Sequence, residues 1–204
     1  MSVGIDKSTS RDGRDRLLAE RGYAAMELRD VAERGNAPRG SIYHHFPRGK
    51  AQLAAEAAAL DGERTREMIE KSLARHGIKG TLRLFADFFR SQSARHPELI
   101  GCPVAAAALA HPEDPELAAV ATAAFQSWEQ PIAAALEAQG IAANDAAAFA
   151  ALTVSTIEGA LLRVRASGDH AALDLAVTGL ETALDGLLCA SQPGHALRPA
   201  PTIT

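Results

Sequence analysis

The sequence predicts an all-α protein, and its composition and apolar spacing carry this prediction. Of the 204 residues, 47% are hydrophobic, which is enough for a sizeable core, yet 44 are alanine and only 9 are aromatic. Alanine is the best helix former and a poor strand former. Apolar residues also recur at helical intervals over most of the chain. We therefore expect thin, closely packed helices, arranged as an N-terminal three-helix head with a helix-turn-helix on a larger helical body.

The head, residues 1–50, is predicted to contain three short helices. The first ends at Gly22, a natural C-terminal stop, and its apolar face is thin, with Leu17 and Leu18 and little else. The second and third are separated by Gly35 and Asn36, which tolerate the left-handed backbone region of a tight turn. The three predicted helices are residues 11–21, 27–34 and 39–46.

The body, residues 51–190, is predicted to consist of longer helices. The first breaks at His76 and Gly77, and the next carries apolar residues on most of its circumference, so we expect it to be buried. Pro131 lies inside a later helix, where its ring is expected to produce a kink. We expect the segment 191–204, with three prolines, to be disordered. The predicted helices are residues 51–75, 80–95, 104–110, 116–139, 145–166 and 171–190.

The composition excludes several classes of protein. Two cysteines are too few for a disulfide scaffold or a four-cysteine zinc site. We find no apolar run of the ~18 residues that would span a bilayer, and residues 1–10 lack the apolar stretch of a secretory signal. These observations predict a cytoplasmic protein with reduced thiols and no membrane partner.

The charge is unevenly distributed between head and body. Residues 1–50 hold ten Lys or Arg against seven Asp or Glu, whereas the remainder holds eleven against eighteen. A basic head on an acidic body suggests that the head meets a polyanion.

The second and third head helices have the lengths of a helix-turn-helix, in which the second helix enters the major groove of DNA. Arg39 can reach a phosphate or a guanine, and Ser41 a phosphate or a base edge. Tyr43 can reach a phosphate oxygen, with His44 also on the exposed side. Lys50 would begin the next helix, where its charge and the N-terminal N–H groups together can bind a phosphate.

The head sequence closely resembles the TetR family of bacterial transcriptional repressors. The resemblance rests on Gly22-Tyr23, on Leu28-Arg29-Asp30-Val31-Ala32, and on the stretch from Ala37 to Pro47 with its Gly-Ser-Ile-Tyr-His-His-Phe-Pro segment. In the body, Gly101-Cys102-Pro103-Val104, Phe125 with Trp128, and Glu158-Gly159-Ala160-Leu161 resemble the regulatory domain of the LmrA/YxaF-like branch.

This resemblance implies a homodimer whose two heads bind a palindromic operator and whose bodies bind a small hydrophobic or amphipathic inducer that releases the DNA. The implied DNA contacts are Arg39, Gly40, Ser41, Tyr43, His44 and Lys50, with His45 and Arg48 in addition. The chain departs from the family at Gly13, Arg14 and Asp15, where apolar residues are usual, and at Asn36, where a turn glycine is usual. Met26 stands where a capping Ser or Thr is common, with an expected loss of ~1 kcal/mol.

Aromatic side chains at helical spacing in the body have two interpretations. They pack a core, or they line a ligand pocket beside the kink expected at Pro131. Cys102, before Pro103 at a helix start, is either a packing residue or a redox sensor, because a thiolate is favoured there. Few polar residues are expected to face the pocket, which favours an apolar or aromatic inducer. The candidate pocket residues are Phe85, Phe88, Phe89, Cys102, Phe125, Trp128 and Arg163.

The last two helices are the candidates for dimerisation, through a four-helix bundle between two subunits. One carries a stripe of small residues beside an apolar stripe, and the other carries a stripe of leucines. The alternative is that both stripes are internal core. The candidate interface residues are Ala151, Ser155, Gly159, Leu180, Leu184 and Leu187.

Three alternatives to a ligand-responsive repressor remain at this point. An all-α enzyme could use the same cavity, but the sequence has no Gly-x-Ser-x-Gly, His-Glu-x-x-His, phosphate-loop or dinucleotide motif. A helical dimer without DNA binding, or an activator in place of a repressor, also fits the pattern. Adjacent His44 and His45 point ~100° apart on a helix and have no third ligand in view, so no metal and no cofactor are expected.

Overall fold

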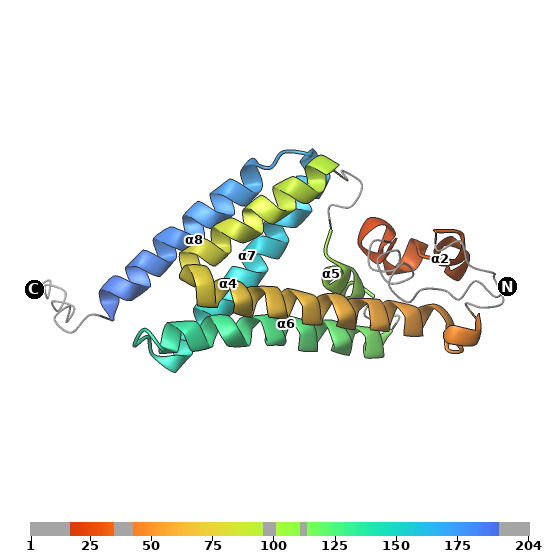
Figure 1. The fold of residues 1–204 in the computed structure, drawn as a ribbon, viewed down its shortest axis with the longest axis horizontal. Coiled ribbons are helices and arrows are strands. Elements are labelled where there is room, and N and C mark those ends of the chain that lie inside the picture. Colours follow the sequence, from red (N-terminus) through yellow and green to blue (C-terminus); the bar gives the residue numbers. More distant parts are fainter. Residues whose placement is uncertain (1–16, 35–42, 96–100, 111–113, 192–204) are drawn as a thin grey trace, which may run out of the picture.

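The computed structural model describes residues 17–34, 43–95, 101–110 and 114–191, and the fold class is all-α, as predicted (Figure 1). The head contributes helical stretches at residues 17–25 and 43–45. The labelled helices are α2 (Leu28–Arg34), α4 (Gly49–Arg95), α5 (Pro103–Ala108), α6 (Pro115–Glu137), α7 (Ala143–Ser167) and α8 (Ala171–Ala190).

Helix α4 is bent into two arms at Gly77, where the backbone takes φ 64° and ψ −172°. A positive φ of this kind suits glycine, and the hydroxyl of Thr81 lies 2.8 Å from the Gly77 carbonyl oxygen. The two arms are the helices predicted at 51–75 and 80–95, and the predicted break is confirmed. The first arm runs along α6, whereas the second turns away toward α7 and α8 (Figure 1).

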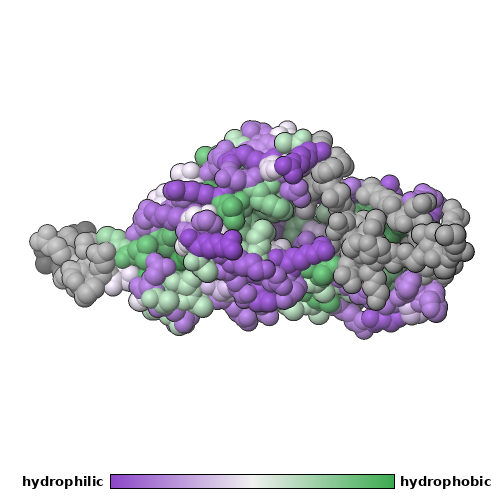
Figure 2. All heavy atoms as spheres, viewed as in Figure 1, coloured by the Kyte–Doolittle hydropathy of each residue, from purple (hydrophilic) through white to green (hydrophobic). Residues whose placement is uncertain are grey.

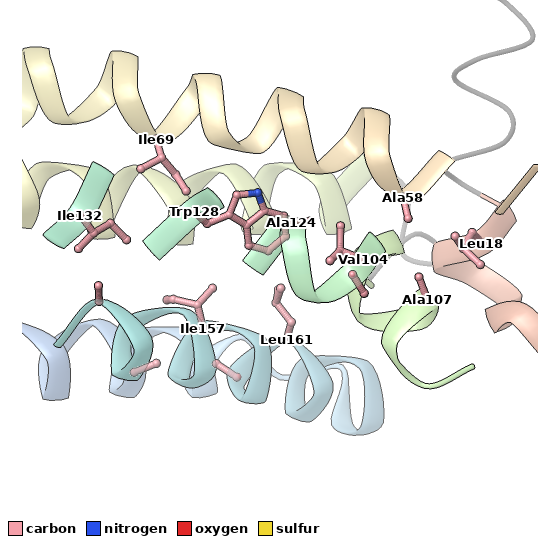
Figure 3. Close-up of a cluster of buried hydrophobic side chains, with 14 of the residues drawn as sticks. Leu18, Ala58, Ile69, Val104, Ala107, Ala124, Trp128, Ile132, Ile157 and Leu161 are labelled. Carbon is pink, nitrogen blue, oxygen red and sulfur yellow. The ribbon is translucent and has the colours of Figure 1, made fainter. Parts of the chain in front are cut away.

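The alanine-rich helices pack closely, as the composition predicts. A Cβ atom placed on Gly62 of α4 would lie only 2.8 Å from the Cβ of Ala124 on α6. The indole of Trp128 donates to the Gly62 carbonyl at 2.8 Å. Figure 3 shows Trp128 and Ala124 facing α4 from α6, with Ile157 and Leu161 of α7 on the other side.

Helix α6 continues through Pro131, so the kink expected there stays a prediction, and the bend that shapes the body is the one at Gly77 of α4. By length and composition alone, α7 could cross a membrane, and it is the one helix among the described residues that passes this test. The sequence analysis did not identify α7 as a possible membrane span, because polar residues such as Ser155 and Glu158 interrupt its apolar sequence. In the structure α7 packs against α6 and α8, with Phe149, Ile157 and Leu161 buried, in the manner of a core helix.

The first head helix is anchored firmly despite its thin apolar face. Leu17 and Leu18 are fully buried, and Figure 3 shows Leu18 beside Ala58 of α4 and Ala107 of α5. Met26, where a capping residue is common, is buried in the same core and so contributes packing. Gly13, Arg14, Asp15, Asn36 and the segment 192–204 lie outside the described residues.

Candidate DNA-binding head and ligand cavity

The head presents three consecutive side chains to solvent at the end of the predicted recognition helix. Tyr43 is 62% exposed, and His44 and His45 are exposed beside it with their rings in a T-shaped contact. Phe46 is buried in the core and holds the segment against the head. These exposed groups match the side chains predicted to face DNA. Arg39, Gly40 and Ser41 lie outside the described residues.

Lys50 lies in the first turn of α4, where the sequence places it, and it also ties the head together. Its ammonium donates to the Ala24 carbonyl at 3.0 Å and lies 4.4 Å from the centre of the Tyr23 ring. Tyr23 in turn donates to Asp114 at 3.2 Å. Arg48 is exposed, and its guanidinium lies 3.5 Å from Glu116. A Lys50 variant would therefore disturb the packing of the head in addition to any effect on the phosphate contact predicted for it.

A cavity of about 360 Å³ lies in the body, in the bend of α4. It opens to the surface and is lined by the two arms of α4, by α6, by α7 and by residues 101–103. Figure 2 shows apolar surface in a hollow near the middle of this face, bordered by hydrophilic residues. The volume and the apolar walls suit a small organic ligand. The aromatic residues on its wall are Phe85, Phe88, Phe89 and Trp128.

The structure brings most of the predicted pocket residues together. Cys102 joins the four aromatic residues on the wall. Phe125 lies behind Trp128, with the ring centroids 5.3 Å apart in a T-shaped contact, and it does not line the cavity. Arg163 is exposed on α7 and does not line it either. Helical periodicity could not show that Trp128 lines the cavity and Phe125 does not, because the two residues lie on the same face of α6.

The cavity is more polar at one end than the sequence predicts, because Asp61 of α4 and Glu158 of α7 both line it. Burial raises the pKa of the Glu158 carboxyl from 4.5 to about 7; a hydrogen bond with Cys102 opposes this shift, and the charge of Asp61 adds to it. Burial, followed by the charges of Glu158 and Asp61, raises the pKa of the Cys102 thiol well above its usual value. The expectation of a thiolate at Cys102 is therefore wrong, since the surroundings keep the thiol protonated.

The polar end of the cavity also touches the head. Ala19 of the first head helix lies on the cavity wall, and Arg165 of α7 donates to the carbonyls of Ala19 and Glu20. A Cβ on Gly101 would lie 2.7 Å from the Ala19 oxygen and 2.8 Å from Arg165. Sequence analysis missed Arg165, because no local pattern marks a side chain that donates to a backbone carbonyl 146 residues away.

The predicted dimer residues fall on different sides of their helices. Ser155 and Gly159 are exposed on α7, and Ala151 is partly buried. Leu180 and Leu184 are each only 2% exposed and belong to the core of the subunit, whereas Leu187 is partly buried against it. Three leucines of α7 and α8 are exposed but were not among the predicted interface residues: Leu152, Leu162 and Leu175. Two of these leucines could have been identified from the sequence. Leu152 and Leu162 are spaced three residues from Ser155 and Gly159, so all four lie on one face of α7.

In the described part of the chain, no three His, Cys, Asp or Glu side chains cluster in a way that could hold a metal ion. His44 and His45 therefore have no third ligand there.

Comparison with known proteins connects both parts of the chain to one family. The family described as bacterial regulatory proteins, tetR family, matches residues 15–57. The family described as transcriptional regulator LmrA/YxaF-like, C-terminal domain, matches residues 74–178.

Individual relatives and solved structures agree with these family matches. The HTH-type regulator Rv0196 of Mycobacterium tuberculosis is 35% identical over 165 residues, 78% of this chain and 84% of the relative. YxaF of Bacillus subtilis is 33% identical over 150 residues, 72% of this chain and 78% of the relative. A TetR regulator from Legionella pneumophila has the same fold, with a TM-score of 0.78 at 20% identity over 90% of this chain and 99% of that one.

Proposed function

The chain belongs to the TetR family of DNA-binding transcriptional regulators, and we propose that it is a homodimeric repressor released from a palindromic operator by a small ligand. Regulators of this type are not enzymes, so the enzyme alternative is excluded. The cytoplasm, where a transcriptional regulator meets its DNA, is the location this proposal implies. We propose residues 1–50 as the DNA-binding domain and 51–190 as the ligand-binding and dimerisation domain, although α4 already begins at Gly49.

The observation that carries the proposal is a cavity that shares its wall with the head. Ala19 lines the cavity directly, and Gly101 and Cys102 lie between the cavity and the first head helix. A ligand that displaces this wall would move the carbonyls that Arg165 holds. The head would then shift relative to the body, and the ligand would favour the state that does not bind DNA.

The proposed DNA contacts are Tyr43, His44, His45, Arg48 and Lys50, together with Arg39, Gly40 and Ser41. Two heads on one dimer would bind two half-sites about one helical turn apart. The proposed dimer face consists of five exposed residues of α7 and α8, with Ala151 at its edge: Leu152, Ser155, Gly159, Leu162 and Leu175.

The direct experiment is selection of binding sites from random duplex DNA, followed by a salt titration on the winning site. The proposal expects a palindrome bound by a dimer, with affinity that falls steeply as salt rises, because phosphate contacts release counterions. A folded dimer that selects no sequence above background would refute the DNA-binding role. Reporter expression driven from the selected site then distinguishes a repressor from an activator.

The two tyrosines of the chain provide a matched pair of variants for this assay. Tyr43→Phe removes from each head one exposed hydroxyl that is proposed to contact a phosphate, and at about 1 kcal/mol for each of the two heads we expect operator affinity of the dimer to fall roughly thirtyfold. Tyr23→Phe removes a hydroxyl that binds Asp114 inside the protein, and should leave operator affinity within twofold. Equal losses in both variants would contradict the contact assigned to Tyr43.

A further inference from the structure

The acidic side chains at the polar end of the cavity indicate the charge of the ligand, whereas the apolar walls indicate only that part of the ligand is apolar. Glu158 lies on the cavity wall, and the contact found for its carboxylate among the described residues is the thiol of Cys102. Asp61 approaches it from α4, so two acidic groups from different helices meet at one end of the cavity. Two carboxylates in a confined apolar site repel each other, and a cation between them removes that repulsion.

The charged groups around Glu158 come from α4, from α7 and from the first head helix. From α4 the cavity receives Asp61 and Arg64, and from the segment before α5 it receives Cys102, whose thiol is neutral. Arg64 is exposed, so water screens its charge more than it screens the partly buried carboxyl of Glu158. Arg165 and Arg21 lie with Glu158 around the neighbouring pocket, where Arg165 binds the carbonyls of the head and Arg21 binds Asp30.

The rest of the wall is aromatic. Phe85, Phe88, Phe89 and Trp128 surround the space beside the carboxylates. Aromatic faces attract cations and also bury apolar rings. An apolar body with a positive group therefore complements both parts of the wall.

We propose that the ligand of this cavity is a hydrophobic or aromatic compound carrying a protonated amine, with the amine bound to Glu158 beside Asp61 and the apolar body held among the aromatic side chains. The inference rests on the proposed ligand-responsive function and narrows it to one chemical class. With a pKa of about 7, Glu158 is roughly half protonated at pH 7, and binding of the protonated amine releases the remaining proton to water, so that the bound carboxyl is ionised. Glu158 therefore acts as the specificity residue of the cavity, and the phenylalanines supply affinity without selecting charge.

The test uses two probes that share one apolar body and differ in charge, 4-phenylbenzylamine and 4-phenylbenzyl alcohol. Trp128 is the single tryptophan of the chain and lines the cavity, so its fluorescence reports binding to the full-length protein. We expect the amine to bind at least tenfold more tightly than the alcohol at pH 8. In Glu158→Gln this preference should fall to within twofold, while the alcohol still binds and shows that the cavity is intact. Glu137→Gln, on the exposed end of α6, is the matched control and should keep the full preference.

The pH dependence provides a readout that needs no variant. Affinity for the amine should fall roughly tenfold or more between pH 8 and pH 5, because Glu158 takes up a proton, whereas affinity for the alcohol should change little. Equal binding of the two probes, or a preference that survives Glu158→Gln, would overturn the amine inference and leave the proposed function intact. If neither probe binds but a neutral aromatic library does, the inference is again overturned. If nothing binds while the selected operator is still recognised, the ligand response itself fails.

Discussion

Glu158 illustrates how burial changes the chemistry of one residue. Its carboxyl belongs to an otherwise apolar stripe on α7, and the neighbouring walls remove water from it, which raises its pKa to about 7. The folded state therefore holds this proton more tightly than the unfolded chain does. A charged Glu158 is a source of instability at neutral pH, and a cationic ligand would relieve it.

This shift predicts the effect of pH on stability. The stabilising contribution of the Glu158 proton is present at acidic pH and is lost as pH rises from 4.5 to about 7. Glu158→Gln, which cannot ionise, should match the wild type near pH 4.5 and exceed it by about 2–3 kcal/mol at pH 8. Urea unfolding at the two pH values measures the difference. A stability gain that is the same at both values would show that Glu158 does not titrate as described.

At the scale of elements, the contact between the first head helix and α7 connects the two parts of the molecule. Leu17 and Leu18 bury the apolar side of that helix, and Arg165 donates to the carbonyl oxygens of Ala19 and Glu20 on it. A hydrogen bond from a charged guanidinium is stronger than one between neutral groups.

Arg165→Ala should loosen this helix without unfolding the body. We expect hydrogen exchange of amides in residues 17–25 to become about tenfold faster, because hydrogen bonds to a charged group contribute about 1.5–3 kcal/mol. Arg163→Ala changes an exposed arginine on the same helix and should leave this exchange unchanged. Identical exchange in the two variants would contradict the role of Arg165 in holding the head.

The close approach of α4 and α6 also belongs to this scale. Gly62→Ala would place a Cβ 2.8 Å from that of Ala124, so the helices must separate, and we expect a loss of about 1–3 kcal/mol in unfolding free energy. Gly186→Ala, on α8, places its Cβ in open space and should stabilise the protein by up to about 1 kcal/mol through helix propensity. Denaturant unfolding compares the two, and the Trp128 emission should shift in Gly62→Ala, since the indole binds the Gly62 carbonyl. A stable Gly62→Ala protein would show that the helices are not in contact there.

At the scale of the whole molecule, the exposed leucines of α7 and α8 leave an apolar surface that a second subunit would cover. Leu162 is 58% exposed and shares a helix face with Ser155 and Gly159. A charged residue at position 162 would lose its hydration when the dimer forms, and this cost opposes dimerisation.

Leu162→Asp should therefore convert the dimer to a monomer and reduce operator affinity by at least a hundredfold, because one head alone reads one half-site. Ala134→Asp is the control, since Ala134 is exposed on α6 and lies outside the proposed dimer face. Sedimentation velocity and operator binding measure both variants. A dimeric Leu162→Asp protein would place the interface on another surface.

Much of this protein could be predicted from local patterns alone. Alanine content and helical periodicity determine the all-α fold, and glycine at position 77 determines where α4 bends, because only that backbone tolerates φ 64° easily. The exposure of Tyr43, His44 and His45 could be predicted because the apolar residues of that short helix are needed for the core, which leaves these three side chains for the surface. Each of these features depends on residues within a few turns of one another.

The tertiary structure alone decided which faces meet. Periodicity shows that Leu180 and Leu184 lie on an apolar stripe, but only packing shows that the stripe faces the core of the subunit itself. The pairing of Glu158 with Asp61, the cavity in the bend of α4 and the contact of Arg165 with the head join segments that are distant in sequence. Burial and electrostatic shifts depend on what removes water from a group, and the neighbours that do so come from other helices.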